Sequence, residues 1–202
     1  VPSSGGTCAV SLGVANKINA RHVGNGPTAA VIKVVRIGGK DRYETNLLVN
    51  ERFAAAPDTV LLASGKDFPD ALAMGPVAYQ GFPLILTGGT TLGATEKAQL
   101  SDFKPTKVVI AGGTGVVSQA IETSLKAQGF KVLRLAGTDR TLTAAAIATW
   151  ATDGVPGAAA GSIGAAQGAF SDTASISTGS GFADALAAGP GAASGHVVFG
   201  AE

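Results

Sequence analysis

Short apolar runs alternate with amphipathic stretches along this chain. The runs are rich in leucine and β-branched residues, and their continuous apolar character is typical of strands that are buried on both faces. They predict strands at 30–35, 59–63, 84–87, 107–111 and 130–133. The amphipathic stretches predict helices at 41–53, 68–80, 95–103 and 118–128. Because strands and helices alternate, the most economical topology is a parallel sheet covered by helices, which is an α/β fold.

The chain also contains an internal repeat. The segment RIGGKDRYET at 36–45 returns as RLAGTDRTLT at 134–143, which is 98 residues later. A second segment, which runs from Asp58 to Pro76, returns 114 residues later. The change of offset places an insertion in the second copy at 151–168, and its high glycine and alanine content predicts a long loop.

These offsets divide the chain into three parts. Residues 1–33 form an N-terminal segment, residues 34–133 form the first copy, and residues 134–202 form the second copy. The end of the second copy, at 195–199, aligns with residues 81–85, and nothing after it matches residues 108–118. We therefore expect two tandem parallel-sheet repeats of which the second is incomplete.

Four aspartates recur at predicted helix starts. An aspartate at such a position accepts hydrogen bonds from free backbone N–H groups and complements the helix dipole. This pattern predicts structural capping by Asp41, Asp70, Asp139 and Asp184.

Composition narrows the function classes. The net charge is +1 with 14% charged residues, which argues against a nucleic-acid binder. No apolar run reaches the length of about 20 residues that a membrane-spanning helix needs. One cysteine, Cys8, and two distant histidines offer neither a disulfide nor a nucleophile–base pair. The Gly112–Gly115 turn lacks the rest of a nucleotide-binding motif. We therefore expect no catalytic residues, no metal and no cofactor.

Three ordered motifs carry a family resemblance. They are RIGGKDRYET from Arg36, SGKDFPDALAMGP from Ser64 and VVIAGGTGVVS from Val108. In this order they resemble the cell wall binding repeat 2 family of Gram-positive bacteria. The resemblance implies tandem Rossmann-like or Toprim-like α/β repeats in a secreted protein of the cell wall or cell surface. It also implies non-covalent attachment to an anionic wall polymer rather than catalysis.

Recurring arginines are candidate polymer contacts, because an arginine can grip phosphate or carboxylate through two parallel hydrogen bonds. Lys66 joins them because it follows a predicted strand at its carboxyl end, where open α/β sheets tend to bind ligands, although the second copy has Ser180 in its place. The candidates are Arg36, Arg42, Lys66, Arg134 and Arg140. A structural interpretation stays open beside this one, in which each arginine pairs with a neighbouring carboxylate or carbonyl.

The N-terminal segment suggests a second function class. Its apolar stretch at 8–14, followed by a short helix at 15–20, loosely echoes residues 108–128. It could cover the incomplete second copy of its own chain, or exchange between chains and make a homo-oligomer. A self-assembling subunit of a surface layer or filament is therefore the alternative function. A nucleotide-dependent enzyme is a weaker third possibility.

Overall fold

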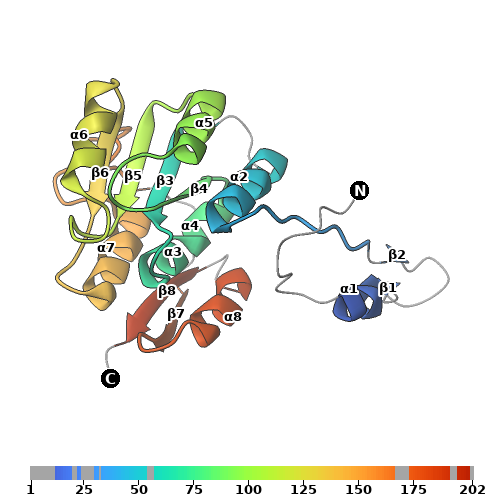
Figure 1. Ribbon diagram of the computed structural model, residues 1–202. Helices are drawn as coiled ribbons and strands as arrows, with labels where there is room; N and C mark the ends of the chain where they lie inside the picture. The colour runs from blue at the N-terminus through green and yellow to red at the C-terminus, as the bar shows by residue number, and fades with distance from the viewer. Residues whose placement is uncertain are drawn as a thin grey trace.

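The computed structural model describes residues 12–19, 22–23, 30–31, 33–53, 57–166, 173–191 and 195–200 (Figure 1). The helices are α1 (Leu12–Asn19), α2 (Arg42–Phe53), α3 (Pro69–Ala73), α4 (Gly75–Tyr79), α5 (Ala94–Phe103), α6 (Gln119–Ala127), α7 (Arg140–Thr152) and α8 (Ala183–Gly191). The strands are β1 (His22–Val23), β2 (Ala30–Val31), β3 (Thr59–Ser64), β4 (Leu84–Thr87), β5 (Lys107–Ala111), β6 (Lys131–Leu135), β7 (Thr173–Thr178) and β8 (Gly195–Gly200).

A four-stranded parallel sheet forms the centre of the molecule. Its strand order is β4-β3-β5-β6, so the strand that leads into the second copy, β6, is the last strand of the sheet of the first copy. Every residue of β3 is buried, as expected for a strand with helices on both faces. The parallel α/β architecture and the strands expected at 59–63, 84–87 and 107–111 are confirmed.

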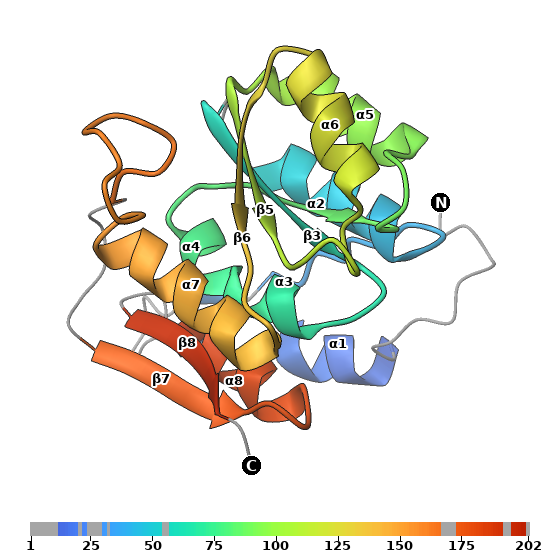
Figure 2. The same ribbon diagram turned by 90° about the vertical axis from the view of Figure 1, so that its left-hand side faces the viewer.

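Each face of this sheet has its own core. Alternate residues of β3 point to opposite faces, so Leu61 and Leu62 lie in different cores. One core includes Ile121 and Leu125 of α6 and Leu100 of α5. The other is shared between the copies, because α3 and α4 of the first copy and α7 of the second copy all pack into it (Figure 2). The two copies therefore do not have separate cores.

A second parallel sheet holds β7 and β8 and lies beside α7 and α8 (Figure 2). The pairing of β7 with β8 changes how residues 195–199 align with the first copy. In the first copy Leu61 pairs with Leu84, and in the second copy Ser175, 114 residues after Leu61, pairs with Val197. Val197 lies 113 residues after Leu84, so residues 195–199 match 82–86 and not 81–85. The second copy has lost one residue before β8.

The strand expected at 30–35 is only partly correct. Ala30 and Val31 pair antiparallel with Val23 and His22, and residues 33–39 are in no strand. In the second copy the matching segment becomes β6 because β5 is beside it. Among the described residues, no such neighbour lies beside residues 33–39. β-propensity alone therefore did not make a strand there.

The helix expected at 68–80 is divided in two at Met74, with Pro76 inside the first turn of α4. The insertion is a loop after α7, as expected for residues 153–166, while residues 167–168 lie outside the described part. Trp150 anchors this loop, because its indole Nε1 donates to the carbonyl oxygen of Ile163 at 3.0 Å. The Val155 amide also donates to the Gly164 carbonyl oxygen at 2.7 Å. The inserted segment is thus a closed loop that packs against the core.

Helix α1 agrees with the short helix expected near residues 15–20. Figure 1 places α1, β1 and β2 to one side of the molecule, away from β7 and β8. Completion of the second copy by residues 1–33, within one chain or between chains, stays a prediction. Residues 8–11 lie outside the described part.

Candidate functional site

The repeated segments at 36–45 and 134–143 make the same local contacts. The Asp41 carboxylate accepts a hydrogen bond from the Glu44 amide at 2.8 Å, and that of Asp139 accepts from the Leu142 amide at 2.8 Å. In both segments a threonine hydroxyl, Thr45 or Thr143, accepts from a glycine amide at 3.0 Å. Both aspartates thus stand at helix starts and bind free N–H groups there.

Arg42 and Arg140 also share an environment. Nη1 of Arg42 donates to the carbonyl oxygen of Gly65, and Nη1 of Arg140 donates to that of Gly179, both at 2.6 Å. Each arginine thereby ties the first turn of a helix to the loop after a strand. Both residues are exposed, and each guanidinium has further N–H donors beyond the one used here.

Arg134 is held from three sides. Its Nε donates to Glu122 at 2.8 Å, its Nη1 donates to the Gly112 carbonyl oxygen at 2.7 Å, and its Nη2 reaches the Ser118 carbonyl oxygen at 3.5 Å. Its side chain is 14% exposed and that of Glu122 is 12% exposed. Hydrogen bonds from Lys126 and Arg134 hold the pKa of Glu122 below its usual value. Arg134 therefore fastens β6 to the β5–α6 turn.

Arg36 and Lys66 differ from those three arginines. Both are exposed, and neither side chain has a hydrogen-bond or ion-pair partner within the described ranges. Arg36 is the residue that the repeat aligns with Arg134, yet no counterpart of Glu122 is beside it in the described structure. These two cations are free to meet a ligand.

Asp70 and Arg140 lie near one another at the junction between the two copies. The rings of Phe68 and Phe182 meet edge to face with centroids 5.7 Å apart, and the Arg140 guanidinium lies 5.9 Å from the Phe68 centroid. Asp70 packs against the backbone of Gly112, where a Cβ atom would have no room. Burial raises the pKa of Asp70, and nearby Arg140 opposes that shift.

The expected cap at Asp70 needs correction. The residue at the N-cap of α3 is Phe68, so Asp70 is the second residue of the helix, in its first turn, and its carboxylate faces Gly112. Asp184 is exposed in the first turn of α8. Asp70 and Asp184 occupy matching places in the two copies but meet different surroundings.

Sequence reasoning missed two asparagines of α2. Nδ2 of Asn46 and Nδ2 of Asn50 both donate to the Leu84 carbonyl oxygen, at 2.7 and 2.9 Å, and Oδ1 of Asn46 accepts from the Leu86 amide at 3.0 Å. They satisfy the open edge of β4, which a sheet must protect. A polar side chain on the apolar side of a predicted helix was the available signal.

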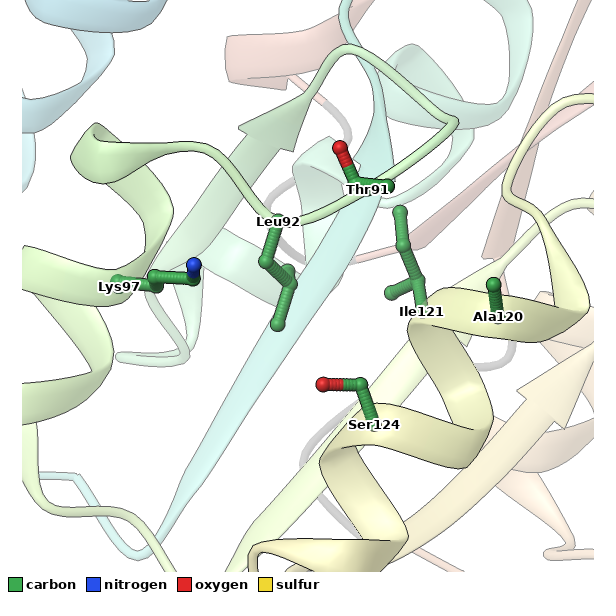
Figure 3. Close-up of a pocket in the computed structure, with 6 residues that line it drawn as sticks. All are labelled: Thr91, Leu92, Lys97, Ala120, Ile121 and Ser124. Carbon is green, nitrogen blue, oxygen red and sulfur yellow. The ribbon is translucent and has the colours of Figure 1, made fainter.

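A shallow hollow lies between the β4–α5 loop and α6 (Figure 3). It is lined by Thr91, Leu92, Lys97, Ala120, Ile121 and Ser124. Its volume of about 140 Å³ is below the roughly 300 Å³ at which small-molecule sites begin. Among the described residues no group of three or more His, Cys, Asp or Glu side chains could hold a metal ion. No helix of the described part has the length and hydropathy to cross a bilayer.

Charge is divided unevenly along the chain. All 15 lysines and arginines lie within residues 1–140, and residues 141–202 contain none. That second stretch contains four acidic residues, Asp153, Asp172, Asp184 and Glu202. Any surface that attracts a polyanion must therefore be built from the first copy and its borders.

Comparison with known proteins agrees with the motifs. Residues 36–122 match the family Cell wall binding domain 2 (CWB2). The chain is 34% identical over 124 residues to the N-acetylmuramoyl-L-alanine amidase LytC of Bacillus subtilis, a match that covers 60% of this chain and 25% of the amidase. It is 35% identical over 106 residues to the amidase enhancer of the same organism, covering 52% of this chain and 15% of that protein. The chain thus spans about a quarter or less of these relatives.

Two solved structures have the same fold. Cwp6 from Clostridium difficile matches 89% of this chain with a TM-score of 0.67 and 21% identity. Cwp8 from the same organism matches 82% of it with a TM-score of 0.64 and 26% identity. This chain corresponds to 28% and 27% of those chains, respectively.

Proposed function

Because residues 36–122 belong to the Cell wall binding domain 2 family, we propose that this protein attaches non-covalently to an anionic polymer of the Gram-positive cell wall. In this role it is a surface-bound binding module and performs no catalysis itself. The observation that carries the proposal is the family match at residues 36–122, which hold 8 of the 15 lysines and arginines of the chain. An anionic ligand needs cations, and the second copy supplies almost none.

The proposed contact residues differ in how much of their charge and hydrogen-bonding capacity is left for a ligand. Arg36 and Lys66 are exposed and have no partner among the described residues, so they contribute their whole charge. Arg42 and Arg140 contribute the donors left after their bonds to Gly65 and Gly179. Arg134 is occupied by Glu122 and two carbonyl oxygens, and we assign it a structural role.

We also propose that the chain consists of two copies of one Rossmann-like unit, the first at 34–133 and the second, incomplete, at 134–202. The hydrogen bonds that Asp41 and Arg42 make in the first copy support this division, because Asp139 and Arg140 make the equivalent bonds in the second copy.

Sedimentation with isolated Gram-positive walls tests the function. We expect the protein to bind, and to bind less as salt screens its cations. An Arg36→Ala/Lys66→Ala variant should fold normally and bind less, because neither side chain supports another residue. Asp153→Ala is a matched surface change that should leave binding unaltered. Binding that ignores both salt and the double variant would contradict the proposal.

The second candidate function is self-assembly. Large apolar side chains are exposed on the second copy, with Ile176 at 76%, Phe182 at 55% and Leu186 at 56% exposure. Within the described residues β7 pairs with β8 alone, so one of its edges is open to another chain. Exchange of the N-terminal segment between chains would cover this surface and would produce rings or filaments.

Size-exclusion chromatography of the whole chain and of a chain without residues 1–33 tests this alternative. Segment exchange predicts oligomers that become folded monomers after the deletion. A whole chain that is monomeric at high concentration would contradict self-assembly and leave wall attachment unaffected.

A further inference from the structure

The carboxyl edge of the central sheet, where α/β proteins usually bind ligands, is partly covered by the second copy, although Lys66 stays exposed there. Phe68, which follows β3, meets Phe182 across the junction. Gly112, which follows β5, packs against Asp70 beside Arg140. In Figure 2 the second copy, with β7 and β8, lies at this end of the sheet, and the amino ends of β5 and β6 lie at the opposite end. The amino edge is therefore a second surface, and it lies away from the second copy.

Lysines gather at the amino edge. Lys107 and Lys131 begin the neighbouring strands β5 and β6 and are direct partners in the sheet register. The Lys131 amide donates to the Thr106 carbonyl oxygen at 3.0 Å, which brings it beside the turn that starts at Lys104. Lys104 and Lys131 are exposed and have no side-chain hydrogen-bond or ion-pair partner in the described part of the chain.

Lys107 is fixed in place by an acid. Its Nζ lies 2.8 Å from Oδ2 of Asp58, whose other oxygen accepts the Thr106 hydroxyl. Hydrogen bonds from Lys107 and Thr106 hold the pKa of Asp58 below its usual value. Asp102, in the last turn of α5, is the other nearby acid in the sequence. Lys107 is thus paired with Asp58, Lys131 also acts on Asp58 through its charge, and Lys104 makes no ion pair among the described residues.

The backbone at Lys104 gives a second, independent observation. Lys104 ends α5 in the left-handed conformation with φ 48°, and it is the single non-glycine residue with positive φ among those described. Glycine is the usual residue there, and a side chain in this region costs about 1 kcal/mol or more. Lys104 therefore holds its backbone in a conformation that glycine would adopt at lower cost.

We propose that the amino edge, formed by Lys104, Lys107 and Lys131, is a surface on which the anionic wall polymer lies. The proposal rests on the proposed function and adds a second contact surface to the one that holds Arg36 and Lys66. Three ammonium groups along one sheet edge suit a flexible chain with repeating negative groups, because each ammonium acts as a point charge without a strict geometry. Residues 141–202, which contain no lysine, provide no second surface of this kind.

The test measures binding of the whole chain to inorganic polyphosphate and, in parallel, to isolated walls. The variant is Lys104→Gln/Lys131→Gln, and the matched control is Lys40→Gln/Lys97→Gln, which removes the same charge from two other exposed lysines. We expect the variant to bind both probes about thirtyfold more weakly, or about fivefold per lysine. The slope of log Kd against log salt should also fall by about 1.4, at about 0.7 for each lost phosphate contact.

The outcomes separate the two proposals. If the wild type binds walls and the variant loses no more affinity than the control, the amino edge is not the surface, and the proposed function survives. If the wild type binds neither probe under low salt, both proposals are wrong. Weakened binding to polyphosphate with unchanged binding to walls also overturns this proposal, because the natural polymer would then lie elsewhere.

Lys104→Gly distinguishes binding from a structural role. Glycine removes the cation and relieves the left-handed backbone, so the thermal midpoint should stay level or rise while polyphosphate binding weakens about fivefold. If Lys104 instead serves to stabilise the end of α5, this variant should melt at a lower temperature and bind as the wild type does.

Discussion

The first and second copies place related residues in opposite environments. Leu62 of β3 is 1% exposed because α5 and α6 cover it, whereas Ile176, 114 residues later in β7, is 76% exposed. Both strands are parallel to a partner strand in matching places, and both are followed by a glycine that accepts an arginine donor. Similar local structure therefore does not make a similar core. The strand–helix pair β5–α6 creates the difference, because only the first copy has it among the described residues.

Replacing Leu62 and Ile176 in turn by alanine should give the largest difference in the free energy of unfolding. Leu62→Ala removes methyl groups from a closed core and should lower the free energy of unfolding by about 3 kcal/mol. Ile176→Ala should change it by less than about 0.5 kcal/mol, because its side chain is already in solvent. Chemical denaturation of both variants measures the contrast. Equal losses would mean that a partner covers Ile176 in solution, which would sharpen the case for self-assembly.

The aligned arginines provide a second contrast. Arg134→Ala would leave Glu122 with Lys126 as its one ion-pair partner among the described residues and would free two carbonyl oxygens, so it should cost about 2 kcal/mol, less than breaking a fully buried pair. Arg36→Ala should cost less than about 0.5 kcal/mol. Thermal melts of the two single variants test this. A large loss from Arg36→Ala would show that a residue outside the described ranges holds it.

A smaller effect is expected at the junction between the copies. Burial is the main cause of the raised pKa of Asp70, so the folded protein binds its proton more tightly than the unfolded chain does. This carboxyl therefore destabilises the fold at neutral pH, and its cost is relieved as pH falls toward the ordinary value of 3.8. Asp70→Asn should raise stability at pH 7 by about 0.5 kcal/mol, because Asp70 is only partly buried and solvent screens it.

Melting temperatures between pH 4 and 7 measure the Asp70 effect. The gain from Asp70→Asn should shrink toward the acid end, where the wild-type carboxyl is itself protonated. Asp184→Asn, at the exposed matching position, should change the free energy of unfolding at pH 7 by less than about 0.5 kcal/mol. A variant that is less stable at pH 7 would mean that attraction to Arg140 outweighs burial.

Much of this arrangement could be predicted from local patterns. The continuous apolar runs of β3, β4 and β5 located the sheet, because strands buried on both faces contain few polar residues. The spacing of Asp41 and Asp139 before apolar helices located two helix starts. These features depend on residues that are near one another in the chain.

What could not be predicted depends on partners far away in the sequence. Residues 33–39 and 131–135 have similar apolar character, yet only the latter form a strand, because β5 lies beside them. Arg36 and Arg134 occupy the same motif, and only a structure reveals that Glu122 holds one of them. Asn46 and Asn50 stand 34 to 40 residues from the strand edge they satisfy, so their place on the apolar side of a predicted helix did not reveal which groups they bind.

The most direct test of wall attachment compares the same Gram-positive walls before and after chemical removal of their anionic polymer, at one low salt concentration. Our account predicts that the whole chain sediments with intact walls and stays in solution with the stripped walls, because its cations then have no ligand. Equal binding to both preparations would contradict the account, since the protein would be recognising peptidoglycan or another neutral component instead.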